Sequence, residues 1–496
     1  MIQNFRYSWV LLLPMILLSS CYNLNDRIDW AFLKEKHRSS SLKLASIKYL
    51  QQNIPKIYSE KLVFYNLETE REMDIRLDTF KHEDELRQIL ITHTLGYKTK
   101  KFLDRDILTT DQIDTIISES FHTKQRYKWA STISDSLFLH YVLPYKISKE
   151  YPRNWKKYFD EKFGKQLDSL NEIKDIRVQD VTRFLVREME QVYSYDSQNL
   201  LNSQFPDLFE LLYSSKGECF RIASLYTYVL RSAGIPAAVD IVPVWGSQNA
   251  GHAEYISLDS TGRMTSNVAT SHKKGLERAA KVFRLTFENN RNFSDGIRPY
   301  SADYPFLIPY LKNDNIIDVT DQHATVFDIP YNLPQNLNDI PYAYICVYNY
   351  GQWIPVFWSK SKNGKLVFSK MNTDILYRIA LPDKTGGISF YDDVFFLNSK
   401  GEKILLTAKE SINTVVKLEK TNSGALATLE PNQSYILQVL MPGGLWKHVE
   451  NFTTNKQGIV MNANLNNESF YRLVKQGTTA KLERPFLCIN GFQQWR

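Results

Sequence analysis

The hydrophobic pattern changes character along these 496 residues, and this change limits the possible folds more than any other feature. Between about residues 27 and 195, apolar side chains recur at steps of three and four among many Lys, Glu and Asp residues, which is typical of amphipathic helices. Beyond about residue 320, short runs of Tyr, Val, Ile and Phe are separated by turns, as in β-strands. Because the chain is too long for one hydrophobic core, we predict a multidomain α+β protein.

Four segments of the helical part have the clearest periodicity. Two of them begin with a residue type that caps helices, Thr110 and Asp180. The predicted helices are residues 42–50, 84–94, 110–121 and 180–192.

Residues 206–267 combine both patterns. A helix is predicted to begin at Cys219 and to end at Ala233-Gly234-Ile235-Pro236, because Gly terminates helices and Pro prevents their continuation. Two strands are then expected at residues 237–244 and 251–258, followed by a turn at 259–262 and a hairpin partner at 263–267.

Cys219 and His252 occupy positions suited to nucleophilic catalysis. A cysteine in the first turn of a helix lies near unpaired backbone N–H groups and the positive end of the helix dipole, so we expect a depressed pKa for Cys219. The same N–H groups can stabilise an oxyanion, and a histidine that starts a neighbouring strand can act as base and acid. As two isolated residues, the pair fits a buried structural cysteine and a hydrogen-bonded core histidine better.

The residues around this pair carry a family resemblance. A Gly217-Glu218-Cys219 turn starts a helix that ends in Leu230-Arg231-Ser232-Ala233-Gly234-Ile235-Pro236, and Gly251-His252-Ala253 follows. This order of features resembles the core of the transglutaminase-like superfamily. The resemblance implies a papain-like α/β domain and a cysteine enzyme of the peptidase, amidase or protein-crosslinking acyltransferase kind.

Carried over by position, the resemblance implies that Cys219 is the nucleophile and His252 its base. The third family position, an Asp or Asn on the next strand, falls on Asn267, because Asp259 comes too early and is expected in a solvated turn. The family often has Trp two residues after the His, where this chain has Glu254. Trp245 could supply the aromatic side chain of the acyl site in place of that Trp, or it could have a structural role.

The last part of the chain is expected to form two small β-sandwiches. Its strands are predicted at residues 342–349, 352–359, 365–369 and 375–379, with a second set from residue 404 to the end. Cys346 and Cys488 fit buried free thiols, and a disulfide between them is the alternative. Four tryptophans fit core packing or, alternatively, a carbohydrate or peptide groove: Trp353, Trp358, Trp446 and Trp495.

The first segment has the features of an export signal. Arg6 precedes an apolar run at residues 9–18, which is too short to span a bilayer. The run ends in Leu18-Ser19-Ser20-Cys21, which resembles the bacterial lipobox and implies cleavage before Cys21 and its diacylation. An ordinary secretory signal with an incidental cysteine is the alternative. We expect a lipid-anchored protein of the cell envelope, on the periplasmic or surface face of the outer membrane.

Composition narrows the expected partners. The net charge of +7 is small for this length and is not gathered in one run, so nucleic acid is not expected. No calcium loop is evident, and we expect neither a metal nor a cofactor. The expected partners are a peptide or protein substrate, with or without linked glycan, and the membrane through the lipid. The histidines of the helical part lack metal-ligand spacing: His82, His93, His122 and His140.

The resemblance extends weakly along the chain. Residues 143–147, 281–284, 318–320 and 484–486 resemble landmarks of long transglutaminase-like lipoproteins from gut and related Bacteroidetes-type bacteria. The expected layout is a signal peptide (1–20), a helical region (21–150), a transglutaminase-like core (151–320) and two β-sandwich domains (321–400 and 401–496).

Two functions from different classes fit these features. The first is a cysteine hydrolase that cleaves peptide or amide bonds through a thioester, favoured over transamidation because nothing indicates a site that excludes water. The second is an inactive scaffold whose β domains bind glycan, peptide or a protein partner, which Glu254 in place of Trp supports.

Overall fold

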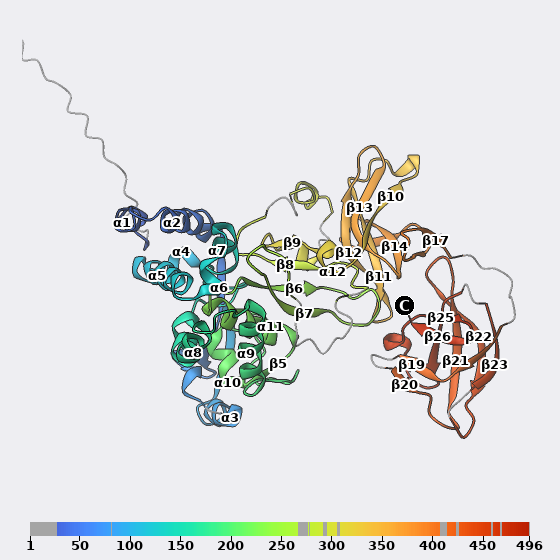
Figure 1. Ribbon diagram of the computed structural model, residues 1–496. Helices are drawn as coiled ribbons and strands as arrows, with labels where there is room; N and C mark the ends of the chain where they lie inside the picture. Colours follow the sequence, from blue (N-terminus) through green and yellow to red (C-terminus); the bar gives the residue numbers. More distant parts are fainter. Residues whose placement is uncertain are drawn as a thin grey trace, which may run out of the picture.

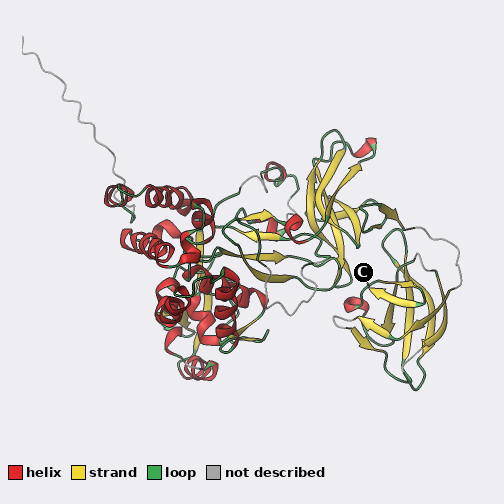
Figure 2. Cartoon of the chain, viewed as in Figure 1, coloured by secondary structure: helices red, strands yellow, loops and turns green. Residues whose placement is uncertain are grey.

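The computed structural model is a mixed α+β protein. Helices gather at one end, antiparallel sheets occupy the other, and a small sheet lies between them (Figure 1, Figure 2). The structure describes residues 27–80, 82–265, 276, 278–290, 295–304, 308–406, 414–422, 426–457, 460–466 and 469–495.

The N-terminal region is built mainly from helices, and all four predicted helical segments are confirmed. Several of these helices share a core to which α1, α2, α5 and α7 contribute, among others, Leu33, Ile47, Ile113 and Phe138. The helices are α1 (Trp30–Lys36), α2 (Ser41–Asn53), α3 (Glu83–Thr92), α4 (Asp104–Ile107), α5 (Thr110–Arg126), α6 (Lys128–Ser131), α7 (Asp135–Tyr141), α8 (Trp155–Asn171) and α9 (Val178–Glu190).

Two helix starts differ from the predicted caps. The residue that caps α5 is Thr109, whose hydroxyl accepts from the Gln112 N–H while the Gln112 side chain accepts from the Thr109 N–H at 2.9 Å. This reciprocal pair is a capping box, and it leaves Thr110 inside the helix. Helix α9 begins two residues before Asp180, and that carboxylate instead pairs with Arg177 at 2.9 Å.

The same region also contains an antiparallel sheet that the sequence pattern did not indicate. Its order is β2-β1-β3, with β1 (Tyr58–Asn66), β2 (Glu72–Met73) and β3 (Leu95–Leu103). Strand β3 is lysine-rich and mostly exposed on both faces. It therefore lacks the apolar alternation by which a strand is recognised.

A four-stranded antiparallel sheet forms the centre of the molecule, in the order β7-β6-β8-β9. Helix α11 (Cys219–Ser232) packs on one face, where Tyr226 meets Tyr255 edge-to-face with ring centroids 5.1 Å apart. The predicted helix and both predicted strands are confirmed. The strands are β6 (Ala237–Val242), β7 (His252–Ser257), β8 (Phe283–Leu285) and β9 (Ile316–Asp318). The short elements before α11 are β4 (Ser194–Tyr195), α10 (Leu208–Ser214) and β5 (Lys216–Gly217).

Helix α11 ends at a glycine, as the sequence predicted. Gly234 has φ +74°, a left-handed conformation that suits glycine. A Cβ at this position would lie 2.6 Å from the Cβ of Ala130 in α6, so the same glycine also permits close packing of α11 against the helical region.

The next sheet is centred on β11 (Tyr342–Asn349), which is buried along its whole length. The sheet runs β12-β11-β14-β16-β17, with β15 on β14, and β10 pairs with β13. Side chains of β11 join the hydrophobic cluster that contains α11 and β6, so the core is continuous between the two regions. The elements are α12 (Thr320–His323), β10 (Val326–Asn332), β12 (Gln352–Lys360), β13 (Lys365–Asn372), β14 (Ile375–Pro382), β15 (Ile388–Phe390), β16 (Phe395–Leu397) and β17 (Lys403–Leu405).

The C-terminal part has a separate core that includes Leu437, Leu473 and Phe486. Its main sheet runs β22-β21-β24-β25-β26, and the pairs β18–β23 and β19–β20 accompany it. The two β-sandwiches remain a prediction. The strands are β18 (Thr414–Leu418), β19 (Lys420–Asn422), β20 (Leu426–Thr428), β21 (Ser434–Leu440), β22 (Trp446–Thr453), β23 (Val460–Leu465), β24 (Tyr471–Lys475), β25 (Phe486–Ile489) and β26 (Phe492–Trp495).

The cysteines of the β regions are free thiols. Cys346 in β11 and Cys488 in β25 are both buried and unbridged. The interpretation as buried thiols is confirmed, and the alternative disulfide between them is wrong because both cysteines are free in the structure.

Two of the short segments that resemble family landmarks, residues 143–147 and 281–284, contain buried lysines that form ion pairs. The Lys146 ammonium lies 2.7 Å from the Asp104 carboxylate. Lys281 pairs with Asp318 and donates to the carbonyl of Ser369 at 2.9 Å, which joins the central sheet to β13. An unpaired buried charge would be costly, so each of these cations is matched by an anion.

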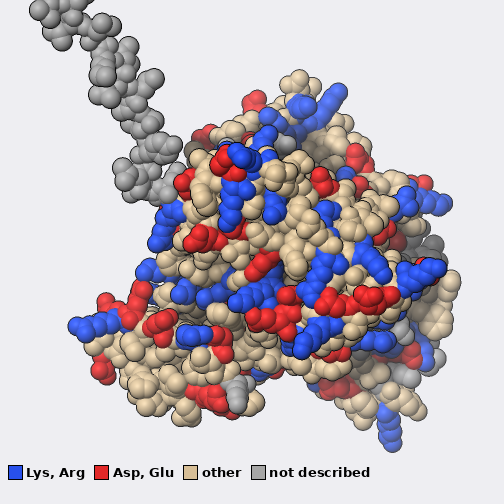
Figure 3. Space-filling model, turned by 60° about the vertical axis from the view of Figure 1, so that its left-hand side comes forward, with Lys and Arg blue, Asp and Glu red and all other residues tan. Residues whose placement is uncertain are grey.

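The surface carries charges of both signs. On the face drawn in Figure 3, Lys and Arg side chains are interspersed with Asp and Glu. Among the described residues, no helix is both long enough and apolar enough to cross a bilayer. The apolar run at residues 9–18 and Cys21 lie outside the described residues.

Candidate active site

Cys219 is the first residue of α11 and is partly exposed. The preceding residue, Glu218, has an extended backbone and its side chain makes no capping hydrogen bond. The backbone N–H groups of Ala253, Phe220 and Cys219 itself act to lower the pKa of the thiol. The start of α11 therefore places Cys219 near the beginning of β7, to which Ala253 belongs.

The pKa of Cys219 departs from the sequence-based prediction. Burial raises the pKa of this thiol above its ordinary value, and the nearby Glu218 carboxylate raises it further. The N–H groups of Ala253 and Phe220 oppose the rise without cancelling it. The predicted depression is therefore wrong for this conformation, because burial outweighs the helix N-terminus.

His252 begins β7 and lies opposite Val242 of β6. Its ring faces Trp245, with ring centroids 6.0 Å apart and an interplanar angle of 31°. Ala253, whose backbone N–H acts on the thiol of Cys219, directly follows His252 in β7. The helix start and the strand start thus meet, with an aromatic ring beside the histidine.

The loop between β6 and β7 is held by a residue from the next sheet. Asn349, the last residue of β11, donates through its amide to the carbonyls of Trp245, Gln248 and Ala250 at 3.1, 2.9 and 3.1 Å. Its carbonyl oxygen accepts from the Ala250 N–H at 3.1 Å. These four bonds close the loop two residues before His252.

A second brace comes from the C-terminal part. The buried Arg484 guanidinium donates to the carbonyl of Gly246 at 2.6 Å and also to the carbonyl of Tyr348. The Asn249 amide donates to the carbonyl of Leu482 at 2.7 Å. No local pattern in the sequence indicates either brace, although residues 484–486 resemble a landmark of the family.

Residues 173–273 match the family model described as the transglutaminase-like superfamily. The chain contains a transglutaminase-like region. The match covers less than half of the chain and includes α11, β6 and β7, with Cys219 and His252. No curated protein matches the chain.

The departure from the family at Glu254 has a structural reason. Glu254 lies opposite Asp240 in the register of β6 and β7, and its carboxylate is 3.7 Å from the ring of His323. Asp240 in turn accepts two bonds from Arg284, at 2.8 and 2.9 Å, and lies 2.7 Å from His323. In this transglutaminase-like region, position 254 therefore belongs to a buried polar network.

Burial raises the pKa of Glu254 to about 7, with Asp240 raising it further and His323 opposing the rise. The neighbouring Asp240 behaves oppositely: it is also buried, but Arg284 and His323 hold its pKa below the ordinary value. The aromatic residue near His252 is instead Trp245, which comes from the preceding loop.

The third predicted site residue, Asn267, lies outside the described residues. Asp259, which the sequence placed in the turn, is confirmed there: its carboxylate accepts from the N–H groups of Thr261 at 2.9 Å and Arg263 at 3.1 Å. Met264 then pairs with Leu258, as expected of a hairpin return. Within the described ranges, no group of three or more His, Cys, Asp and Glu side chains has the arrangement of a metal site.

Two of the β-region tryptophans lie at a junction between the β parts. Trp353 and Trp446 both pack edge-on against Tyr348, with ring centroids 5.6 and 5.8 Å apart. The Arg472 guanidinium lies 4.3 Å from the Trp446 ring centroid. These contacts favour packing over a ligand groove for this pair.

Proposed function

We propose that the transglutaminase-like region is the active site of a cysteine hydrolase that cleaves peptide or amide bonds, with Cys219 as nucleophile and His252 as base. The observation that carries the proposal is that the thiol of Cys219, at the start of α11, is influenced by the backbone N–H of Ala253, the residue that follows His252 in β7. It lies inside the segment that matches a superfamily of cysteine enzymes.

The proposed chemistry uses two acyl transfers. His252 takes the thiol proton, and the Cys219 sulfur attacks the acyl carbon of the substrate to form a tetrahedral oxyanion. Backbone N–H groups at the start of α11 are available to this oxyanion. His252 then protonates the departing amine, which leaves a thioester, and a water molecule deprotonated by His252 releases the acid. Asn267 is proposed to hold the ring of His252 in the required tautomer.

A thiol-directed electrophile at pH 7 tests this proposal, with the modified cysteine located by peptide mapping. We expect modification of Cys219, none in Cys219→Ser, and a rate at least ~10-fold lower in His252→Ala because the base is lost. The buried Cys346 and Cys488 serve as internal controls. Equal reaction of the wild type and His252→Ala would contradict a catalytic pair.

A second candidate function has its own supporting observation. The raised pKa of Cys219 and the place of Glu254 in a buried network both fit a transglutaminase-like scaffold without catalysis, whose β regions bind glycan, peptide or protein. For this candidate we expect no modification of Cys219 at pH 7. We also expect a rise in melting temperature on adding a bound glycan or peptide.

We also propose that the protein is anchored to the cell envelope through a lipid on Cys21. The support is the Leu18-Ser19-Ser20-Cys21 sequence after an apolar run. Metabolic labelling with an alkyne fatty acid in a bacterial host is expected to mark the wild type and not Cys21→Ala. If the wild type and Cys21→Ala are both recovered without label and equally in the soluble fraction, the protein has no lipid anchor.

A further inference from the structure

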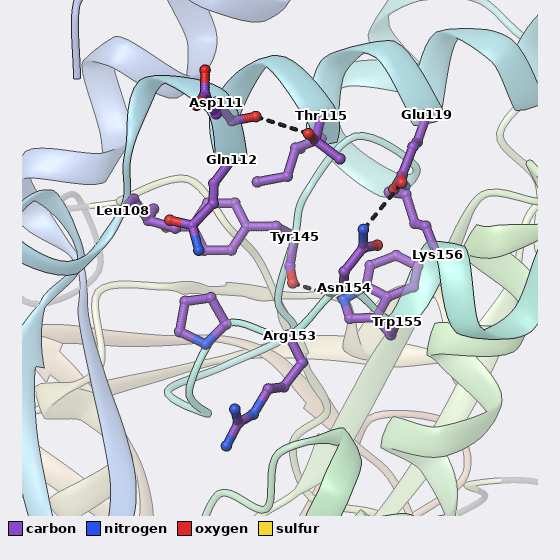
Figure 4. Close-up of a pocket in the computed structure, with 12 residues that line it drawn as sticks. Leu108, Asp111, Gln112, Thr115, Glu119, Tyr145, Arg153, Asn154, Trp155 and Lys156 are labelled. Carbon is purple, nitrogen blue, oxygen red and sulfur yellow. Dashed lines mark hydrogen bonds between the residues drawn. The ribbon is translucent and has the colours of Figure 1, made fainter. Parts of the chain in front are cut away.

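A cavity of about 220 Å³ lies in the N-terminal half of the molecule. One wall is helix α5, and the other is the segment from Pro152 to Lys156 that begins α8 (Figure 4). Ligand sites for drug-sized molecules have volumes of about 300–1,000 Å³, so a cavity of this size fits a small metabolite.

The floor of the cavity is apolar. It includes Leu108, Tyr145 and Trp155, all almost fully buried. The polar atoms of the two aromatic residues are already bonded within the protein: the Tyr145 hydroxyl donates to Asp104 at 2.5 Å and the Trp155 indole to the Tyr145 carbonyl at 2.7 Å. The small part of these side chains that faces the cavity is therefore ring and aliphatic carbon.

One buried cation lines the same cavity. The Lys156 ammonium donates to the carbonyl of Val142 at 2.6 Å and lies 4.5 Å from the centroid of the Trp155 ring. In the part of the chain that the structure describes, Lys156 forms no salt bridge. A lysine ammonium has three donors, and a buried charge without a counter-ion is costly, so an anion in the cavity would stabilise it.

Two acidic residues of α5, Asp111 and Glu119, also line the cavity. The Asp111 carboxylate points away from the other lining residues, whereas Glu119 accepts from the Asn154 amide at 3.0 Å (Figure 4). Arg153, which also lines the cavity, already pairs with Asp207 at 2.7 Å. The cavity thus combines a lysine ammonium that forms no salt bridge among the described residues, the Glu119 carboxylate and an apolar part of the lining.

We propose that this cavity binds a free amino acid with an apolar side chain, or a dipeptide of that kind. The ligand carboxylate pairs with Lys156, its ammonium group with Glu119, and its side chain packs against the apolar part of the lining. This site is independent of Cys219, so its test does not depend on whether that residue is catalytic.

Isothermal titration calorimetry on the full chain tests the recognition of each ligand group. L-leucine is compared with leucinamide, which lacks the carboxylate, and with 4-methylpentanoate, which lacks the ammonium group. We expect leucine to bind at least ~10-fold more tightly than either analogue. Leucinamide leaves Lys156 without an anionic partner, and 4-methylpentanoate leaves Glu119 without a cationic one. No binding of leucine, phenylalanine or an apolar dipeptide at millimolar concentration overturns the proposal.

Matched variants assign the contacts. Lys156→Met is expected to bind leucine no better than leucinamide, whereas Lys157→Met, at the exposed neighbouring position, retains the wild-type preference. Glu119→Gln is expected to lose the preference for leucine over 4-methylpentanoate. Wild-type selectivity in both Lys156→Met and Glu119→Gln overturns the assignment.

A proton-uptake measurement on the wild type keeps the test decisive if Lys156→Met fails to fold. Burial and the Arg231 guanidinium lower the pKa of Lys156 to about 7, and Glu119 opposes this. At pH 8 a bound carboxylate is expected to draw a proton onto Lys156, so the binding enthalpy of leucine varies with the ionisation enthalpy of the buffer. At pH 6 the lysine is already protonated and this dependence disappears. An enthalpy independent of the buffer at both pH values contradicts the role of Lys156.

Discussion

Asn349 and Ala250 form a reciprocal pair of hydrogen bonds across two sheets. The Ala250 N–H donates to the side-chain oxygen of Asn349, and the Asn349 amide donates back to the Ala250 carbonyl, both at 3.1 Å. Ala250 has φ +67°, a conformation that a non-glycine residue adopts only when its surroundings support it. The residue that leads into His252 is therefore held in place by the neighbouring sheet.

Replacing Asn349 with Ala is expected to release this loop. The variant loses four hydrogen bonds in a buried place, which should lower the free energy of unfolding by about 1–3 kcal/mol. It should also slow the reaction of Cys219 with an electrophile. Gln352→Ala is the control, because Gln352 is exposed and pairs with Asn349 across β11 and β12. Equal effects of the two substitutions would mean that the loop is held by other contacts.

Arg484→Met tests the brace from the C-terminal part. The substitution leaves the buried carbonyls of Gly246 and Tyr348 without this donor, so a loss of about 2–4 kcal/mol in stability is expected. Hydrogen exchange should accelerate in the loop between β6 and β7. Lys481→Ala, at an exposed position nearby, should leave that exchange unchanged. Unaltered exchange in Arg484→Met would show that the loop holds its shape without the brace.

Glu254→Gln should change how stability depends on pH. The pKa of Glu254 is about 7 in the folded protein and about 4.3 in an unfolded chain. Between these values the unfolded chain ionises while the folded protein keeps its proton, so wild-type stability falls as pH rises through this window. The variant does not lose stability in this way. Between pH 4.5 and 7.5, its free energy of unfolding should therefore rise by about 1–3 kcal/mol relative to that of the wild type. Denaturation midpoints of both proteins at pH 4.5 and pH 7.5 measure this difference in stability. The control Glu68→Gln, at an exposed position, should show no such difference.

Glu218→Gln should make Cys219 more acidic. The Glu218 carboxylate raises the pKa of this thiol, so its removal lowers the pH at which alkylation by iodoacetamide sets in. At a pH below the thiol pKa, the fraction of Cys219 present as thiolate should rise. Labelling should therefore accelerate by about a few-fold, because a Coulomb interaction near the protein surface has a modest energy. Glu161→Gln on the exposed face of α8 is the control. An unchanged pH profile would remove Glu218 from the causes of the raised pKa.

Gly234→Ala should destabilise the junction between α11 and the helical region. The new Cβ meets that of Ala130 at 2.6 Å, and the backbone has φ +74°, so a loss of about 1–3 kcal/mol is expected. Gly443→Ala is the matched control, because a Cβ there meets nothing within 4 Å and its φ is not positive. Thermal denaturation of both variants measures the difference, and equal melting temperatures would contradict the close approach.

Much of the local structure was predictable from sequence. The start of α11 at Cys219, its end near Gly234 and the extent of β11 follow from signals carried by neighbouring residues. Strand β3 was missed because its lysines conceal the alternation. The predicted pKa of Cys219 had the wrong sign because the helix start is a local feature, whereas burial depends on everything that packs around it.

The sequence alone determined which residues stand at the start of α11 and β7, because capping, periodicity and helix termination act over a few residues. The tertiary structure decided what surrounds them. Asn349 reaches Ala250 across 99 residues and Arg484 reaches Gly246 across 238, and no periodicity encodes such pairings. They form because folding leaves buried donors and acceptors that need partners, and the partner is whichever group the packing brings within hydrogen-bonding distance.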